Sequence, residues 1–148
     1  MIRFANFSDV PAIEACAREA YAKYVERIGK EPAPMVADFA SLVENRHVRL
    51  STDMNDGLEG FVIFYPEGNH MHLENVAVAN KHRGKGIGRR LIALCEAEAV
   101  RLGYDSVELY TNEKMTENLA LYPLLGYVEF DRRTEDGFNR IYFRKVLR

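Results

Sequence analysis

The segment that most constrains the fold of this chain is a basic, glycine-rich turn between a strand-like run and an amphipathic helix. The turn consists of Arg83, Gly84, Lys85, Gly86, Ile87 and Gly88. It follows the run Met71 to Val78, and helical spacing of apolar residues then continues from Ile87 to Leu102. Gly103 stands where that helix would end, and the strand-like run Ser106 to Thr111 comes next. We therefore predict a parallel strand–helix–strand unit.

The residues before this unit predict a short strand and two helices. Ile2 to Phe7 is strand-like, and Ser8 is a candidate helix N-cap. Apolar residues recur at helical spacing from Ile13 to Ile28, and Gly29 ends the pattern. A weaker helix is expected around Val36 to Asn45, after a proline-containing break.

The middle and the end of the chain are rich in strand patterns. The runs Val48 to Thr52 and Leu58 to Tyr65 precede Met71 to Val78, and turn-forming residues separate them. We therefore predict an antiparallel meander. After the crossover we expect a helix and two closing strands, at Thr116 to Leu125, Tyr127 to Arg133 and Phe138 to Lys145. The predicted fold class is mixed α/β: one domain over residues 1–148, whose central sheet is antiparallel first, partly parallel later, and flanked by helices.

The composition excludes several classes of protein. The 148 residues carry a net charge of -2 with both signs interspersed, unlike the basic footprint of a nucleic-acid-binding protein. No apolar run approaches the roughly 18 residues of a membrane span, and Met1 to Asn6 lacks the apolar core of a secretory signal. Cys16 and Cys95 have no metal-ligand spacing and lie in helical patterns. We expect a cytoplasmic protein with two buried thiols and no metal, nucleic-acid or membrane partner.

The glycine-rich turn is suited to a polyanion. The first N–H groups of a helix have no partner within the helix and carry partial positive charge. Glycines remove the side chains that would keep a phosphate away from those donors. Five basic residues crowd the same segment: Lys81, Arg83, Lys85, Arg89 and Arg90. A solvated basic turn is the alternative, but it does not need alternating glycines, so we predict a pyrophosphate site.

Two common phosphate-binding motifs do not fit this turn. A Walker A loop requires Gly-Lys-Ser/Thr at its end, which is absent. A dinucleotide fingerprint requires a third glycine, and the position set by Gly84 and Gly86 holds Arg89. The position set by Gly86 and Gly88 holds Leu91. The turn also follows several strands of a meander instead of the first strand of a parallel sheet, so both nucleotide-binding classes are excluded.

What remains resembles the GCN5-related N-acetyltransferase (GNAT) family. Its signature, Gln/Arg-x-x-Gly-x-Gly/Ala, is matched in register by Arg83, Gly86 and Gly88. The segment Asn118 to Tyr127 is similar to the family's second motif of Asn, Ala, Tyr and Gly-Phe/Tyr. The resemblance is specific from about Leu73 onward to the end of that motif. It implies the GNAT-like acyl-CoA N-acyltransferase fold, with acetyl-CoA as co-substrate.

The resemblance also implies where acetyl-CoA would bind. In that family the strand before the turn splays away from its parallel neighbour and pairs with the pantetheine arm. Carried over, this role falls to the backbone of Val76, Ala77 and Val78, whose side chains can still pack in the core. Main-chain N–H groups from Arg83 to Gly88 would hold the pyrophosphate, and Asn118 would contact the pantetheine or phosphate arm.

Candidate catalytic groups follow from the same resemblance. Tyr122 matches the tyrosine that contacts the cofactor and donates a proton or a hydrogen bond to the leaving sulfur; a core aromatic is the alternative. Pro123 directly after it departs from a regular helix and puts the placement of Tyr122 in doubt. A base must accept the proton of an alkyl ammonium whose pKa is near 10. Glu74 is the first candidate, His72 the second, and a chain of waters the third.

The acceptor amine is the least constrained part of the reaction. In the family the first two helices and the late loops select it. In this sequence these segments hold Tyr21, Tyr24, Arg27 and the stretch Glu31 to Met35, with Arg132, Arg133 and Phe138 in the closing hairpin, and His72 is a further contact. Tyrosines and arginines favour a small polar acceptor, and ordinary packing explains them as well. We expect an N-acetyltransferase acting on a primary amine of a small molecule by direct attack. A non-catalytic acyl-CoA-binding sensor and a protein N-terminal or lysine acetyltransferase are the alternatives, and a homodimer is left open.

Overall fold

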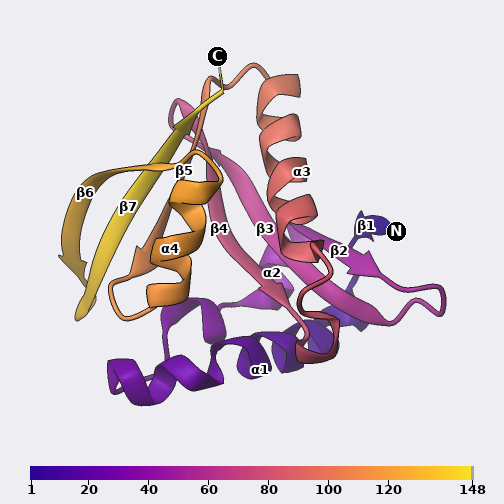
Figure 1. Ribbon diagram of the computed structural model, residues 1–148. Coiled ribbons are helices and arrows are strands. Elements are labelled where there is room, and N and C mark those ends of the chain that lie inside the picture. The colour runs from indigo at the N-terminus through magenta and orange to yellow at the C-terminus, as the bar shows by residue number, and fades with distance from the viewer. Residues whose placement is uncertain (148) are drawn as a thin grey trace.

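The structure is a computed structural model that describes residues 1–147 as a seven-stranded sheet with flanking helices (Figure 1). The strands are β1 (Ile2–Phe4), β2 (Val48–Thr52), β3 (Leu58–Glu67), β4 (His70–Val78), β5 (Ser106–Asn112), β6 (Val128–Glu135) and β7 (Phe138–Val146). The helices are α1 (Val10–Ile28), α2 (Phe39–Glu44), α3 (Ile87–Arg101) and α4 (Thr116–Leu124). Three short 3₁₀ turns, η1 (Phe7–Asp9), η2 (Ala33–Met35) and η3 (Asn80–His82), complete the described chain. Within residues 1–147, every helix is too short or too polar to traverse a bilayer.

The strand order confirms the mixed sheet expected from the sequence. It runs β1-β2-β3-β4-β5-β7-β6, and β4 and β5 are the parallel pair. The other neighbouring strands pair antiparallel. Helix α3 makes the crossover between β4 and β5, as the strand–helix–strand pattern predicts, because a parallel connection must return along the sheet.

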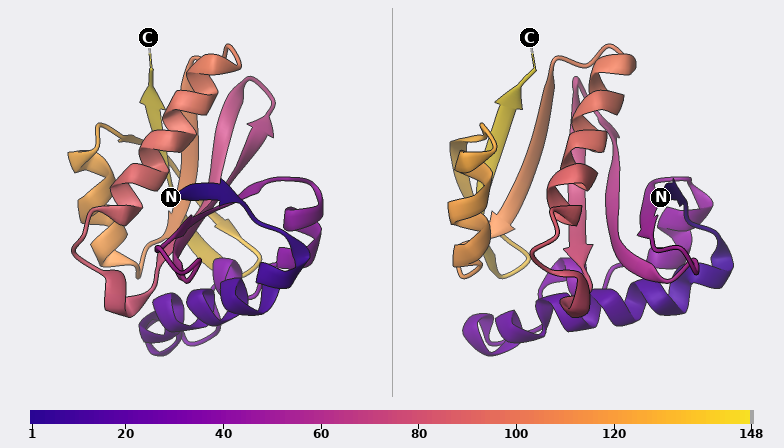
Figure 2. Two further views of the ribbon diagram at one scale, coloured as in Figure 1. Left: turned by 90° about the vertical axis from the view of Figure 1, so that its right-hand side faces the viewer. Right: turned by 45° about the vertical axis from the view of Figure 1, so that its right-hand side comes forward.

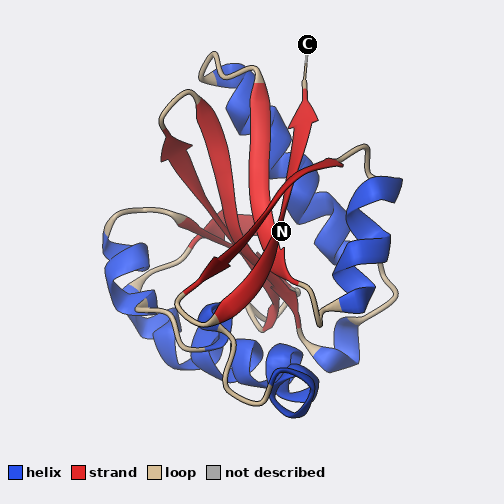
Figure 3. Cartoon of the chain, turned by 90° about the vertical axis from the view of Figure 1, so that its left-hand side faces the viewer, coloured by secondary structure: helices blue, strands red, loops and turns tan. Residues whose placement is uncertain are grey.

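Each face of the sheet has its own core. On one face, α3 buries Ile87, Leu91 and Cys95 against a cluster that includes Val62 and Phe64. On the other face, α1 and α2 bury a second cluster over the first half of the sheet, with Ile13, Ala17, Phe39, Phe61 and Ile63 among its members. Figure 3 shows the helices surrounding the sheet in this way. Because α1 and α2 cover only the first strands, the same face remains open near β5 and β7.

The start of the chain corrects two expectations. The strand β1 ends at Phe4 instead of Phe7, and Ser8 is not the N-cap. Asn6 caps the η1 turn instead: its side chain accepts the Ser8 N–H at 3.0 Å, and Asp9 accepts the Asn6 N–H at 2.8 Å. Asp9 can reach back because a bidentate Arg3 guanidinium, at 2.8 and 2.9 Å, holds its carboxylate there. This reciprocal capping box satisfies two donors that Ser8 alone would leave free.

The predicted second helix is shorter than expected. The range Val36 to Asn45 contains α2 only from Phe39, because the Asp38 side chain accepts the Ser41 N–H at 3.1 Å and caps the helix there. The other element predictions agree with the structure to within a few residues at each end. Cys16 and Cys95 are buried free thiols, as expected, and burial raises the pKa of Cys16 to about 12.

Candidate active site

The centre of the molecule is a cavity that opens where β4 and β5 separate. The two strands pair only through Met71 with Val107 and His72 with Glu108. Beyond these pairs they diverge, as the right-hand view of Figure 2 shows. The cavity has a volume of about 270 Å³ and is lined by residues 73–76 of β4 and 109–112 of β5, among others. The splay predicted from the resemblance is therefore present, and it leaves the β4 edge free of β5 from Leu73 onward.

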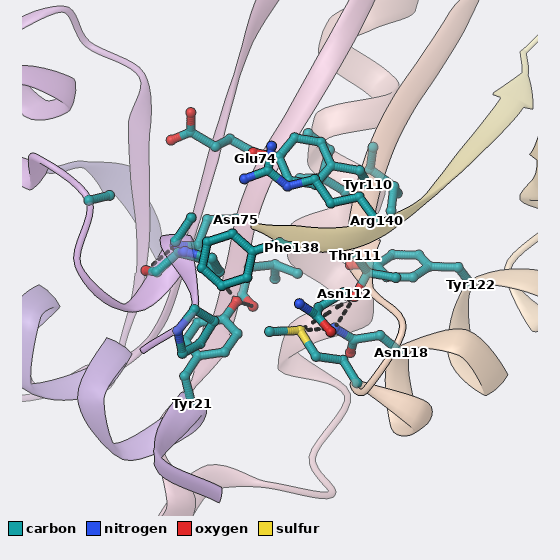
Figure 4. Close-up of a pocket in the computed structure, with 18 residues that line it drawn as sticks. Tyr21, Glu74, Asn75, Tyr110, Thr111, Asn112, Asn118, Tyr122, Phe138 and Arg140 are labelled. Atoms are coloured by element: carbon teal, nitrogen blue, oxygen red, sulfur yellow. Dashed lines mark hydrogen bonds between the residues drawn. The ribbon is translucent and has the colours of Figure 1, made fainter. Parts of the chain in front are cut away.

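Glu74 projects from a β-bulge in β4. Ile63 pairs with Asn75 and Phe64 pairs with Leu73, so Glu74 has no partner in β3. A bulge of this kind re-aims the bulged side chain and locally disrupts the ladder. The Glu74 carboxylate accepts a 2.7 Å hydrogen bond from the Tyr65 hydroxyl. Figure 4 shows the carboxylate directed away from the Asn112 and Asn118 end of the cavity.

The glycine-rich turn has the geometry of an anion site at a helix start. Gly84 and Gly86 both have φ of 78°, a left-handed conformation that favours glycine, and a Cβ at either would meet nothing within 4 Å. Gly86 is the N-cap of α3 and has no side chain to cap the helix. The N–H groups of Ile87 and Gly88 at the first turn of α3 therefore have no helical partner. The Ile87 side chain, only 2% exposed, anchors this turn in the core.

The basic side chains of the turn are exposed. Within residues 1–147, no carboxylate lies within salt-bridge distance of Arg83, Lys85 or Arg89. Lys85 instead has its ammonium group 3.3 Å from Nδ1 of His82. These cations and the helix dipole act in the same direction, so the turn presents a concentrated positive potential to a phosphate group.

The side chains of the β4 residues expected to contact the cofactor pack in the two cores. Val76 and Val78 turn their side chains toward the core under α3, and Ala77 is buried toward α1. A Cβ added at Gly88 would lie 3.5 Å from the Val78 side chain, so the end of β4 and the start of α3 are in close contact. The carbonyl of Val76 accepts a 3.3 Å hydrogen bond from the Tyr21 hydroxyl.

Tyr122 lies at the wall of the cavity in spite of the proline that follows it. Pro123 is the second-last residue of α4, so it falls where the helix ends and does not displace the preceding turn. The ring of Tyr122 is 5% exposed and packs edge-on against Tyr127 at 5.6 Å between centroids. Among residues 1–147 the hydroxyl has no hydrogen-bond partner. Burial raises the pKa of Tyr122 well above its usual value, so the group is a neutral donor facing the cavity.

Asn118 is held against the end of β5. Its amide donates hydrogen bonds to the Thr111 hydroxyl at 3.2 Å and to the Met115 sulfur at 3.7 Å. Both partners are buried, so the amide is fixed with its oxygen available to the cavity. Figure 4 shows Asn118, Thr111 and Asn112 grouped at one end of the cavity, with Glu74 at the other.

A buried hydrogen-bond chain positions the loop that closes the cavity from the α1 side. The Tyr21 hydroxyl donates to Oδ1 of Asn75 at 2.6 Å, and the Asn75 amide donates to the Pro34 carbonyl at 3.0 Å. Asn75 is only 4% exposed, so these bonds satisfy an amide that would otherwise be costly to bury. The sequence carried no signal for this chain beyond a polar residue in an apolar strand.

A second cavity, of about 400 Å³, adjoins the first on the open face of the sheet. The two share Glu74, Leu109 and Tyr110. The second is lined by four carboxylates, Glu67, Glu74, Glu108 and Glu135. His72 also lines it, as its predicted place on the same face as Glu74 requires, and burial lowers the pKa of His72 below its usual value.

Tyr24 and Arg27 lie outside the cavity between β4 and β5. Arg27 donates to the Glu117 carboxylate at 2.7 Å and Lys23 lies 3.0 Å from the same carboxylate, which ties α1 to the first turn of α4. The Arg27 guanidinium stacks over Tyr24, whose ring is 4% exposed. The structure therefore accounts for Arg27 as part of an ion pair between α1 and α4, and for Tyr24 as a buried core residue beneath the guanidinium.

Several cavity residues were not singled out from the sequence. Thr111, Asn112 and Tyr110 come from the carboxyl end of β5, and Arg140 reaches over the Tyr110 ring from β7 at 4.4 Å. Polar residues where a parallel strand ends are a known sign of a ligand site, and Thr111-Asn112 carries that sign. The three residues of the closing hairpin that the sequence did single out lie differently. Phe138 lines the cavity and Arg133 lines the adjoining one, whereas Arg132 is exposed and paired with Glu129.

Comparison with known families identifies the family of this chain. The profile described as the acetyltransferase (GNAT) family matches residues 13–127. The chain belongs to the GNAT family. It is accordingly an enzyme of the acyltransferase class, and the match spans α1, the glycine-rich turn and the Tyr122 segment. A search of curated proteins finds no match.

Solved structures of acetyltransferases share the fold of this GNAT protein. The ribosomal-protein-alanine N-acetyltransferase from Brucella melitensis superposes with a TM-score of 0.75 at 24% identity over 99% of each chain. PaiA N-acetyltransferase from Thermoplasma acidophilum, in complex with coenzyme A, gives 0.76 at 15% identity, covering 99% of this chain and 98% of that one. Nourseothricin acetyltransferase superposes with a TM-score of 0.63 at 23% identity. The aligned part covers 68% of this chain and 65% of that one.

Proposed function

We propose that this GNAT enzyme transfers the acetyl group of acetyl-CoA to a primary amine of a small molecule by direct attack. One observation carries the proposal: a single cavity between the splayed strands has Asn118 and Tyr122 on one side and Glu74 on the other. The donor half is supported by the coenzyme A complex of a structural neighbour. The acceptor half rests on the cavity itself.

The chain offers binding groups for each part of acetyl-CoA. The N–H groups at the start of α3, with Gly84, Gly86 and Gly88 keeping the approach open, suit the pyrophosphate. The free edge of β4 at residues 76–78 suits the amide groups of the pantetheine arm, because an extended arm can pair with it as a strand would. The Asn118 amide, which Thr111 holds at the cavity, is the proposed hydrogen-bond partner of the same arm. Acetyl-CoA supplies an activated acyl group as a thioester.

Glu74 is the proposed base. An alkyl ammonium has a pKa near 10, so the amine must lose a proton before it can attack. Glu74 lines both cavities and its carboxylate is oriented by Tyr65, so it can accept that proton directly or through water. His72 lines the second cavity alone and is the second candidate. A neutral imidazole there could relay a proton, since burial disfavours its charged form.

Tyr122 is the proposed donor to the leaving sulfur. A thiol has a pKa of about 8.5, far below that of the buried Tyr122 hydroxyl, so complete proton transfer from the phenol is uphill. The hydroxyl therefore acts as a hydrogen-bond donor that stabilises the developing thiolate, and solvent completes the protonation. The position of the ring between Tyr127 and Phe143 keeps the hydroxyl aimed at the cavity without side-chain freedom to lose.

The second cavity favours a cationic acceptor. Glu108 pairs with Arg144 and Glu135 with Arg140, whereas the carboxylates of Glu67 and Glu74 have no cation within 4 Å among residues 1–147. An acidic, aromatic recess attracts ammonium groups. The same acidic lining is the one observation that favours a second candidate function, acetylation of a protein N-terminus or lysine, which needs a cation-attracting groove.

A direct assay tests the proposal. Thiol release from acetyl-CoA should be measured with a panel of small monoamines, diamines, amino acids and peptides with free N-termini, and the products identified by mass spectrometry. We expect turnover with small cationic amines and an N-acetylated product. Tight acetyl-CoA binding without turnover on any amine would favour the sensor alternative. Preference for peptides over every small amine would favour the protein acetyltransferase.

A further inference from the structure

Three metal-ligating side chains gather at the turn between β3 and β4. His70 and His72 are two residues apart on β4, so they project from the same face of the strand. Glu67, at the end of β3, is the cross-strand partner of His70. One ligand atom from each of the three lies within 4.8 Å of the other two. Strand pairing thus brings two imidazoles and a carboxylate together.

The His70 imidazole has two acceptor atoms near its Nδ1. Nδ1 of His70 lies 3.6 Å from a Glu108 carboxylate oxygen and 3.4 Å from the Asn69 side-chain oxygen, which leaves Nε2 for a ligand. A carboxylate that accepts a hydrogen bond from a histidine fixes the ring of a metal ligand and strengthens it as a donor. At 3.6 Å the His70–Glu108 contact is an ion-pair distance and not a hydrogen bond, and the same Glu108 oxygen accepts from Arg144 at 3.0 Å, so Glu108 becomes this outer partner only after a small shift of the side chains.

His72 is a buried polar side chain without a protein partner. It is 7% exposed, and its ring lies between Tyr65 at 5.4 Å and Tyr110 at 5.8 Å. Among residues 1–147 its ring nitrogens make no hydrogen bond, and they are not among the fully enclosed unpaired atoms because the side chain lines the second cavity. A polar group in such a recess normally has a partner, either water or a ligand. A ligand in the cavity would supply one.

We propose that Glu67, His70 and His72 bind a divalent transition-metal ion such as Zn²⁺. Two imidazoles and one carboxylate are the donor set of many three-ligand zinc sites, whereas Mg²⁺ and Ca²⁺ take oxygen ligands. Neighbouring ligands of a tetrahedral zinc lie about 3.4 Å apart. Glu67 is exposed and its carboxylate has no salt bridge within residues 1–147, so its side chain can rotate inward to close the site.

The rest of the cavity supports a cation at this point. Glu74 and Glu108 add negative charge nearby, and all three ligand residues line the same cavity as these two carboxylates. The sequence predicted no metal, because the expectation rested on the spacing of the cysteines. The site instead depends on the register that sets Glu67 opposite His70.

The test measures metal binding and is independent of acetyl transfer. Protein without an affinity tag is stripped with a chelator and titrated with Zn²⁺ by calorimetry, and with Co²⁺ by visible absorption, whose intensity reports tetrahedral coordination. We expect one ion per chain. His72→Gln and Glu67→Gln should each weaken Zn²⁺ binding at least about 100-fold, and Glu108→Gln, which alters the outer partner of His70, about 10- to 100-fold.

His82→Gln is the matched control, because His82 lies on η3, away from the second cavity, and should leave binding unchanged. Glu67→Gln alters an exposed side chain, so it remains a fair test if His72→Gln fails to fold. Absence of stoichiometric Zn²⁺ binding, or binding that survives both Glu67→Gln and His72→Gln, overturns the proposal. Neither result bears on the proposed acetyl transfer, which the amine assay judges separately.

Discussion

The hydroxyl of Tyr65 donates a 2.7 Å hydrogen bond to the carboxylate of Glu74, the residue that bulges out of β4. Tyr65 stands on β3, so the bond holds the bulged side chain against the neighbouring strand. Burial, followed by the bond to Glu74, raises the pKa of Tyr65 above its usual value. The hydroxyl is therefore a permanent donor, and Glu74 is presented to the cavities in one orientation.

Tyr65→Phe tests whether this orientation matters for turnover. A hydrogen bond to a charged group contributes about 1.5–3 kcal/mol, so we expect kcat to fall roughly 10-fold or more while the Kd of acetyl-CoA stays unchanged. Steady-state kinetics and calorimetry measure the two. Tyr104→Phe, at a tyrosine outside both cavities, is the control. Equal kcat values for wild type and Tyr65→Phe would remove the positioning role.

Glu74→Gln removes the proposed base and keeps the shape of the side chain. We expect kcat/KM to fall about 10²- to 10⁴-fold at neutral pH. The loss should shrink as the pH rises, because a growing fraction of the amine is already deprotonated. Rates measured from pH 7 to pH 10 test this, with Glu44→Gln on the exposed side of α2 as control. A loss that is the same at every pH would contradict the role of base.

Tyr122→Phe keeps the ring packed against Tyr127 and Phe143 and removes only the hydroxyl. We expect kcat to fall about 10- to 100-fold, as for loss of one stabilising donor, with the Kd of acetyl-CoA within twofold of wild type. Because burial raises the pKa of Tyr122, the wild-type rate should show no alkaline decline from this residue up to about pH 10. An alkaline decline that disappears in the variant would show that Tyr122 titrates.

Gly86→Glu should abolish acetyl-CoA binding, because a carboxylate would occupy the anion site at the start of α3. Gly103→Glu is a matched control at the other end of that helix. Both glycines have positive φ, 78° and 88°, and a Cβ at either meets nothing within 4 Å. Each substitution should therefore cost about 1–2 kcal/mol of stability. Calorimetry with acetyl-CoA should find the affinity lost only in Gly86→Glu; unchanged affinity there would sink the assignment of the turn.

Asp9→Asn tests the capping box of η1, the turn that leads into α1. The hydrogen bonds from Arg3 lower the pKa of Asp9 below its ordinary 3.8, so the folded state holds fewer protons on this group than the unfolded state. Its stabilisation is therefore complete above pH 4 and fades as the pH falls below it. We expect the variant to be about 1 kcal/mol less stable at pH 7, with the difference shrinking toward pH 3. Urea unfolding measures it, and Glu14→Gln on exposed α1 is the control.

Much of the fold could be predicted because it depends on local patterns. The helical spacing from Ile87 and the stop at Gly103 define α3, and Gly103 has the left-handed φ of 88° that a helix stop uses. Gly86 at the other end of α3 also has a left-handed φ, of 78°, and it is the residue from which the helix begins. The predicted N-cap was wrong because it considered Ser8 alone and not the side chains around it. Arg3 hydrogen-bonds the Asp9 carboxylate, which accepts the Asn6 N–H, and the N-cap is therefore Asn6 instead of Ser8.

The sequence by itself determined the glycine-rich turn at the start of α3 and the position of Tyr122 on α4, because both are carried by residues within a few positions of one another. Only the tertiary structure decided the surroundings of Glu74, Arg27 and His72. The bulge at Glu74 depends on the register between β3 and β4, and the Glu117 partner of Arg27 lies 90 residues away. Strand register and helix contacts are set by burial over the whole chain, which periodicity within a short window does not contain.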